Sequence, residues 1–281
     1  MPTTAVMRTL SLAALTVLEL SPPEMVSCAA DAGYSHVGLR LIPATDHEPT
    51  WPVIGDTPMV REIEHRLADS GVHTLDIEIF RLRPDTAVAH YLPALETGAR
   101  LGAKHVLVAG NDSEPARLTE RFVALCELGA QFGLTCDLEP MPWTDVKDLQ
   151  QAARIVAASH RANAGVLIDP IHFDRGGNLP ADIAAVPPER LHYAQLCDAP
   201  AQRPSDVPTL LQQARAERLM PGDGGLDLVG ILRALPPALP LALEVPQLTL
   251  ARTVPALERA RRIRAKTEAL LATLQAAAAA G

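Results

Sequence analysis

Eight short apolar runs, each followed by a turn and then by a longer helical pattern, limit the folds open to this chain more than any other feature. Such alternation, at about one unit per 35 residues, is typical of a parallel sheet whose strands are joined by helices. Eight units in 281 residues close most simply into a barrel. The sequence therefore predicts an α/β protein with one (β/α)₈ TIM-barrel domain over residues 1–281. The predicted strands span 9–14, 36–41, 72–80, 105–109, 135–139, 165–168, 191–197 and 240–245.

Helix start and stop signals fall between these runs. Ser21 and Glu24 have the spacing of a capping box, Pro22 occupies the first helical position, and Gly33 marks the end. A doubly wound sheet is the competing architecture, but no glycine-rich phosphate loop follows the first run. The alanine-rich tail, about 276–281, is expected to fray. The predicted helices span 21–33, 57–71, 86–102, 113–132, 145–160 and 249–275, with a further segment at 181–186.

Composition narrows the classes of partner. The chain has 25 lysine and arginine residues against 33 aspartate and glutamate residues, which gives a formal charge of −8. This charge argues against nucleic-acid binding, because that binding requires cations to neutralise phosphates. The four cysteines show no C-x-x-C pairing, so reduced thiols in a cytoplasmic protein are expected. The apolar stretch 10–18 is too short to span a bilayer. We therefore expect a small-molecule substrate, with neither nucleic acid nor membrane as a partner.

Polar side chains close four of the later runs. Glu139 ends the fifth run, Asp169 follows the sixth with His172 three residues on, Gln195 lies in the seventh, and Glu244 lies near the end of the eighth. In a TIM barrel the carboxyl ends of the strands meet at one mouth, so these side chains are expected to converge. Clustered carboxylates repel one another unless a cation lies among them. Because the donors are mostly oxygen, the sequence predicts a site for one divalent ion such as Mn²⁺, Mg²⁺ or Co²⁺.

Each of these residues also has a simpler interpretation. A single Asp or Glu after a strand is more often a helix cap or a loop ion pair than a ligand, and only the four strand ends together favour a site. Arg40, at the end of the second run, could hold an anionic substrate group or form an outward ion pair. Asp198 could orient a ligand or cap a helix. His105 starts a strand, at the end of the barrel away from the mouth, and is interpreted as structural.

Several motifs along the chain resemble the xylose isomerase-like TIM-barrel superfamily, which contains the sugar phosphate isomerase/epimerase group and endonuclease IV. The likeness runs from Ala-Ala-Asp-Ala-Gly-Tyr at 29–34 and Val-Gly-Leu-Arg at 37–40, through Leu-Gly-Ala-Lys at 101–104, to Pro-Gly-Asp-Gly at 221–224. It covers nearly the whole chain, and the motifs are specific as a set rather than singly.

The resemblance implies roles for particular residues. In that family a Glu, an Asp, a His or Gln, and a Glu on consecutive strands bind one divalent ion. The histidine of a D-x-x-H motif contacts substrate there, and this motif matches Asp169 to His172. An arginine three residues before Pro-Gly, which matches Arg218, binds a substrate hydroxyl or carboxylate. In the family's epimerases and isomerases the two glutamates act as base and acid from opposite sides of the substrate. The metal ligands correspond here to Glu139, Asp169, Gln195 and Glu244.

The third ligand leaves the activity open. It is usually histidine in the family's epimerases and isomerases, whereas Gln195 resembles the glutamine of its 3-dehydroshikimate dehydratases. The resemblance therefore implies a metal-dependent enzyme that removes a proton next to a carbonyl, either as a sugar isomerase or epimerase or as a dehydratase (lyase) of the 3-dehydroshikimate or inosose type. In a dehydratase, His172 is the candidate for the base or the acid. A non-catalytic barrel and an endonuclease IV-like nuclease rank lower, and a homodimer is expected from related barrels.

Overall fold

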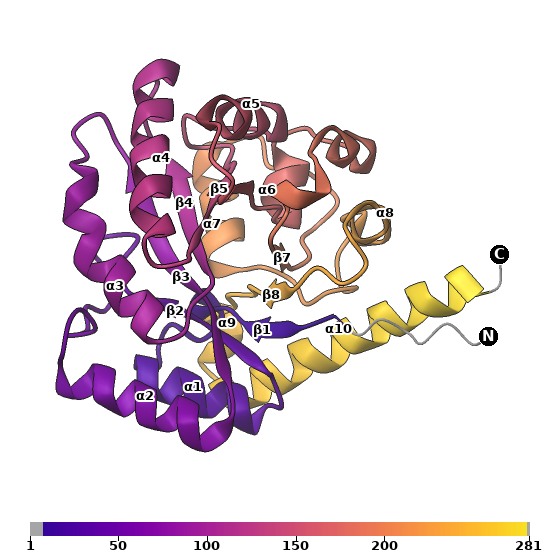
Figure 1. Cartoon of the computed structure of the whole chain (residues 1–281). Coiled ribbons are helices and arrows are strands. Elements are labelled where there is room, and N and C mark those ends of the chain that lie inside the picture. The colour runs from indigo at the N-terminus through magenta and orange to yellow at the C-terminus, as the bar shows by residue number, and fades with distance from the viewer. Residues whose placement is uncertain (1–7, 280–281) are drawn as a thin grey trace.

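The computed structural model describes residues 8–279, and a sheet of eight parallel strands forms its centre. The strands are hydrogen-bonded in the order β6-β5-β4-β3-β2-β1-β8-β7. A parallel bridge between Ile168 and Ala194 links the two ends of this order, with Gln195 N donating to Ile168 O at 2.9 Å. This arrangement is a TIM barrel, which confirms the predicted (β/α)₈ fold (Figure 1). The strands are β1 Leu10–Leu12, β2 His36–Arg40, β3 His73–Leu82, β4 His105–Gly110, β5 Thr135–Glu139, β6 Ala164–Val166, β7 Ala194–Leu196 and β8 Leu241–Leu243.

Helices surround the strands, and most begin where the sequence places a cap. Thr57 Oγ1 accepts a hydrogen bond from Val60 N at 3.1 Å at the start of α2, and Gly71 ends that helix with φ of 69°. The helices are α1 Pro22–Asp31, α2 Pro58–Ser70, α3 Leu92–Arg100, α4 Pro115–Ala130, α5 Leu149–Ser159, α6 Pro170–Arg175, α7 Val207–Ala216, α8 Leu228–Ala234, α9 Leu248–Ala251 and α10 Ala256–Ala279. Short 3₁₀ turns are η1 Ala14–Val17, η2 Val88–Tyr91, η3 Pro180–Ala185 and η4 Pro188–Arg190.

The helix predictions fail in three places. The predicted final helix is two helices, because Pro255 has no N–H to continue α9 and instead precedes α10. The predicted helix 86–102 is the 3₁₀ turn η2 followed by α3, and the segment 181–186, which was not assigned as a helix, overlaps the 3₁₀ turn η3. Helices α6, α7 and α8 were not predicted. Of the tail expected to fray, 276–279 belong to α10, and 280–281 lie outside the described residues.

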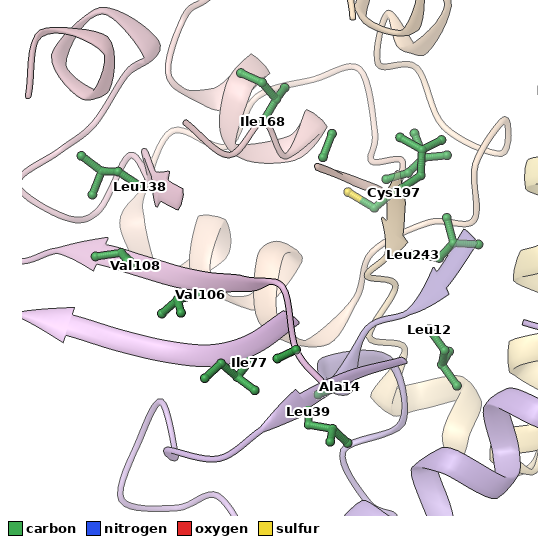
Figure 2. Close-up of a cluster of buried hydrophobic side chains, with 14 of the residues drawn as sticks. Leu12, Ala14, Leu39, Ile77, Val106, Val108, Leu138, Ile168, Cys197 and Leu243 are labelled. Carbon is green, nitrogen blue, oxygen red and sulfur yellow. The ribbon is translucent and has the colours of Figure 1, made fainter. Parts of the chain in front are cut away.

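Two apolar clusters fix which way each strand faces. Alternate side chains such as Leu12, Leu39 and Ile77 point outward and pack with helix residues in one large cluster. Figure 2 labels these three residues. A smaller cluster, which includes Leu107 and Tyr193, comes from the alternate positions of the strands and fills the barrel interior. On β5 the outward positions Cys136 and Leu138 leave Asp137 and Glu139 facing inward. The strand period therefore directs the predicted site residues into the barrel.

Two further expectations concern location. Within residues 8–279, none of the helices is both long enough and apolar enough to cross a membrane. All four cysteines, Cys28, Cys126, Cys136 and Cys197, are buried and carry free thiols.

Candidate active site

Four strand ends bring the predicted metal ligands into one buried group. Glu139 is the last residue of β5, Gln195 lies in β7, and Glu244 directly follows β8. Asp169 follows β6 and caps α6, where its Oδ1 accepts a hydrogen bond from Ile171 N at 2.9 Å. None of the four is more than 4% exposed. Gln195 Nε2 donates to Glu244 Oε1 at 3.0 Å, so the amide and one carboxylate are in direct contact.

Arg218 lies among these carboxylates and is itself only 2% exposed. Its Nη1 is 2.5 Å from Asp169 Oδ2, and its Nη2 is 2.7 Å from Glu244 Oε2. The same guanidinium lies 3.4 Å from His172 Nε2. The arginine that the family resemblance identified therefore reaches the site, where it pairs with two of the four predicted ligands. Its role in binding substrate stays a prediction.

The pKa values of the carboxyl groups reflect this crowding. Burial, together with the nearby charges of Asp169 and Glu244, raises the pKa of Glu139 well above its usual value. Burial also raises the pKa of Glu244 to about 7, although Arg218 opposes the shift. Burial alone would raise the pKa of Asp169, but Arg218 and His172 hold it below its usual value. Ionising all three buried carboxyl groups is thus unfavourable without a cation in addition to Arg218.

His172 completes the group from α6. Its Nε2 is 3.7 Å from Glu139 Oε1 and 3.8 Å from Asp169 Oδ2. Burial lowers the pKa of His172 to about 4, so the ring is neutral at pH 7. Its Nδ1 is buried and has no hydrogen-bond partner, and its ring meets Trp143 edge to face with centroids 4.8 Å apart. The predicted substrate contact of His172 is compatible with this position at the wall of the site.

The donor set fits a cation. Glu139 Oε1 and Gln195 Oε1 are both buried without a hydrogen-bond partner, although each is an acceptor. Glu139, Asp169 and His172 each offer a ligand atom, and these atoms lie within 4.8 Å of one another. Buried acceptors are rarely left without a donor or an ion in folded proteins. Glu139, Asp169 and His172 therefore have the chemistry and the spacing that a divalent ion requires, whereas ligation by Gln195 and Glu244 stays a prediction.

A cavity of about 470 Å³ opens onto this group, a volume suited to a small ligand. Arg40 lines it and forms ion pairs with Glu78 at 2.6 Å and with Glu48 at 2.9 Å. Both partners are buried or nearly so, which makes these ion pairs part of the barrel mouth rather than of the outer surface. The use of Arg40 in substrate binding stays a prediction.

Sequence reasoning missed four arginines of the cavity, Arg81, Arg215, Arg252 and Arg259. The third predicted strand ended at residue 80, whereas β3 continues to Leu82, so the strand-end signal carried by Arg81 went unused. Arg215 lies on α7, which the sequence did not predict, and no pattern marks it as a site residue.

Asp198 anchors the loop that follows Arg218. Its Oδ2 accepts from the backbone N of Gly222 at 3.0 Å and of Gly224 at 2.9 Å, and its Oδ1 accepts from Ala199 and Leu226. Backbone hydrogen bonds also join Asp198 and Leu219 in both directions. Asp198 is therefore not a helix cap but the point to which the Pro-Gly-Asp-Gly loop is fixed, and its role in orienting a ligand stays a prediction.

A second polar cluster lies where strands begin, away from the cavity. His192 Nδ1 is 2.6 Å from Asp137 Oδ1, and Thr135 Oγ1 donates to Asp137 Oδ2 at 2.6 Å. His105 Nδ1 is 2.7 Å from Thr135 Oγ1, so hydrogen bonds join all four residues. The two histidines and Asp137 also offer ligand atoms close enough to share an ion. The predicted structural role of His105 agrees with this network.

Comparison with known proteins identifies the family. The model of the xylose isomerase-like TIM barrel family matches residues 26–266, and the chain belongs to that family. The 3-dehydroshikimate dehydratase of Pseudomonas aeruginosa is 31% identical over 201 residues, which are 66% of this chain and 31% of that protein. The dehydratase of the same name from Pseudomonas putida is 29% identical over 157 residues, 52% of this chain and 24% of that protein. The chain thus spans less than about a third of the length of these curated relatives.

Solved structures share the fold at lower identity. The IOLI protein with a bound zinc atom has a TM-score of 0.76 at 17% identity and covers 95% of this chain and 99% of its own. L-ribulose 3-epimerase has a TM-score of 0.71 at 16% identity and covers 97% of each chain. The curated relatives are thus named as dehydratases, and an epimerase is among the structural neighbours.

Proposed function

We propose that this chain is a divalent-metal-dependent enzyme that removes a proton from the carbon next to a carbonyl group of a small polyhydroxylated substrate. The observation that carries this proposal is the pair of buried acceptors without partners, Glu139 Oε1 and Gln195 Oε1, beside Asp169 and Glu244. An unpaired buried acceptor is costly, and one cation between these oxygens would remove the cost at both. Mn²⁺, Mg²⁺ and Co²⁺ are candidate metals because they suit oxygen donors. Zinc is a fourth candidate because the IOLI neighbour binds it.

The residues would divide the chemistry among them. The ion, held by the four predicted ligands, would supply a Lewis acid for the negative charge that develops on the carbonyl oxygen. Glu139 and Glu244 approach the cavity from β5 and β8, so one carboxylate takes the proton from carbon and the other acts as the acid. His172 faces the same space as a neutral imidazole, which can bond a substrate hydroxyl. Trp143 covers its ring and excludes water from that side.

Among the possible outcomes we favour dehydration of a substrate of the 3-dehydroshikimate type. In that reaction the base removes the proton next to the carbonyl, the adjacent carbon–oxygen bond breaks, and the hydroxyl leaves as water with a proton from the acid. No oxidant or reductant is needed. The dehydratase names of the curated relatives and the glutamine at position 195 support this choice. Epimerisation is the second candidate, supported by the shared fold of L-ribulose 3-epimerase.

A substrate screen tests the proposal. Purified protein with each of the four metals is incubated in D₂O with 3-dehydroshikimate, L-ribulose and hydroxypyruvate. Loss of water from 3-dehydroshikimate, with a new ultraviolet absorption band, is the expected result. Deuterium uptake into a ketose without loss of water would identify epimerisation, rather than dehydration, as the reaction. Absence of both, with every metal, would refute the proposed function.

Two expectations about the chain's setting accompany the proposal. The four buried free thiols support a reducing, cytoplasmic location. A homodimer of single-barrel chains is the expected assembly, and size-exclusion chromatography with light scattering would test it.

A further inference from the structure

Six arginines line the cavity, and they differ in whether a carboxylate pairs with them. Those with a carboxylate partner are Arg40 with Glu48 and Glu78, Arg218 with Asp169 and Glu244, and Arg259 with Glu19. Among the residues that the structure describes, Arg81, Arg215 and Arg252 form no such pair. Arg252 is exposed to solvent, whereas Arg81 and Arg215 are half-buried. The cavity thus contains two partly desolvated cations that form no direct ion pair, although Glu139 acts on Arg81 and Glu48 on Arg215 at longer range.

Arg81 comes from the end of β3. Its Nη1 donates to Asn111 Oδ1 at 3.1 Å, while its Nε is buried and has no hydrogen-bond partner. Burial and the neighbouring charges of Arg215 and Arg83 lower the pKa of Arg81 to about 10. The guanidinium therefore has unused donors and lies close to a second positive charge.

Arg215 comes from α7 and lies beside the catalytic group. Its guanidinium carbon is 5.5 Å from the centre of the Trp143 ring, which in turn contacts His172 edge to face. Burial lowers the pKa of Arg215, the charge of Glu48 opposes this shift and that of Arg40 adds to it, and no acidic side chain forms an ion pair with Arg215. Arg81 and Arg215 repel each other, and an anion bound between the two guanidinium groups would remove that repulsion.

We propose that Arg81 and Arg215 together bind a carboxylate group of the substrate. The inference rests on the proposed function only in taking this cavity as the substrate site. Arginine matches the planar, bidentate geometry of a carboxylate. Glu48, Glu139 and Glu244 line the same cavity, so a group with one negative charge is repelled less than a phosphate dianion. A neutral sugar would leave both arginines without a partner. The substrate class is thus a polyhydroxylated carboxylic acid.

Matched ligands and matched variants test this assignment by binding rather than turnover. Isothermal titration calorimetry with Mn²⁺ present compares shikimate with its neutral methyl ester, and D-fructose 6-phosphate with D-fructose. The proteins are the wild type, Arg81→Gln, Arg215→Gln and the control Arg252→Gln, an arginine of the same cavity that is already solvated. Circular dichroism and thermal melts verify that each variant is folded.

The expected result is that the wild type binds shikimate at least tenfold more tightly than the ester. Each of Arg81→Gln and Arg215→Gln should weaken shikimate binding by about 10- to 100-fold, as for loss of a charge-assisted hydrogen bond, and leave binding of the ester unchanged. Arg252→Gln should bind shikimate as the wild type does.

Three results would overturn the assignment: no binding of shikimate to the wild type, equal binding of acid and ester, or arginine-dependent preference for fructose 6-phosphate. The proposed function fails separately. If shikimate binding depends on both arginines but no substrate is turned over, the carboxylate site stands and the proposed reaction does not. If a neutral ketose is turned over and the arginine variants keep full activity, the proposed reaction stands and the carboxylate site does not.

Discussion

Asp198 anchors the loop that follows Arg218. Replacing one oxygen of its carboxylate tests this role. In Asp198→Asn, an amide NH₂ must face two of the four backbone N–H donors that the carboxylate accepts. A hydrogen bond to a charged group contributes about 1.5–3 kcal/mol, so loss of two lowers the free energy of unfolding by roughly 3–6 kcal/mol. Asp198 itself is only 2% exposed, so water has little access to its carboxylate, although the loop residues Gly222 and Gly224 are exposed.

Urea unfolding followed by circular dichroism measures this change. The control is Asp227→Asn, where an exposed aspartate caps α8 through Gly230 N and a loss of at most about 1 kcal/mol is expected. Because the loop that Asp198 anchors begins three residues after Arg218, the substitution should also displace Arg218 and reduce turnover. An Asp198→Asn protein as stable as the Asp227→Asn control would show that the four hydrogen bonds do not anchor the loop.

Three further changes give distinct outcomes. Glu139→Gln should lower turnover at least 100-fold. Without metal, however, this variant should melt no lower than the wild type, because burial and the charge of Asp169 already raise the pKa of the Glu139 carboxyl. A lower melting temperature would refute the idea that the carboxylates repel one another. Gly165→Ala should cost about 1–3 kcal/mol in urea unfolding, because a Cβ there would collide with Asp137 and His192, and unchanged stability would contradict the packing of that cluster. Burial alone would lower the pKa of His192, but Asp137 raises it above 6.5. The wild type should therefore be more stable than His192→Gln below pH 6.5, and this difference should disappear as the pH rises through the pKa of His192 in the folded protein. A stability difference that does not depend on pH would contradict the ion pair.

The sequence predicted the fold because its local signals agree with one another. The fifth strand was predicted with the bounds that β5 has, and its alternation of apolar and acidic residues already places Glu139 inward. Thr57 and Gly71 mark the two ends of α2 in sequence and structure alike. Eight such strands leave few topologies, so the barrel and the convergence of its strand-end carboxylates follow together.

What the sequence could not predict depends on contacts between distant segments. Arg218 pairs with Asp169 and Glu244, which lie 49 and 26 positions away, and no local pattern encodes that contact. Helix α7, which carries Arg215, has only one buried residue, Ala214, so no set of core positions marks its place in the barrel. Arg81 was missed because β3 extends two residues beyond residue 80, where its apolar run was predicted to end.

Calorimetric titration with Mn²⁺ tests the central claim, a metal site at the strand ends, most directly. We expect one ion per wild-type chain at this site, at least 100-fold weaker binding in Glu139→Gln and Asp169→Asn, and unchanged binding in His192→Gln. The last protein is a control because His105, Asp137 and His192 are the other group whose ligand atoms lie close enough to share an ion among the described residues. Full Mn²⁺ affinity in both carboxylate variants, or its loss in His192→Gln alone, would contradict the account.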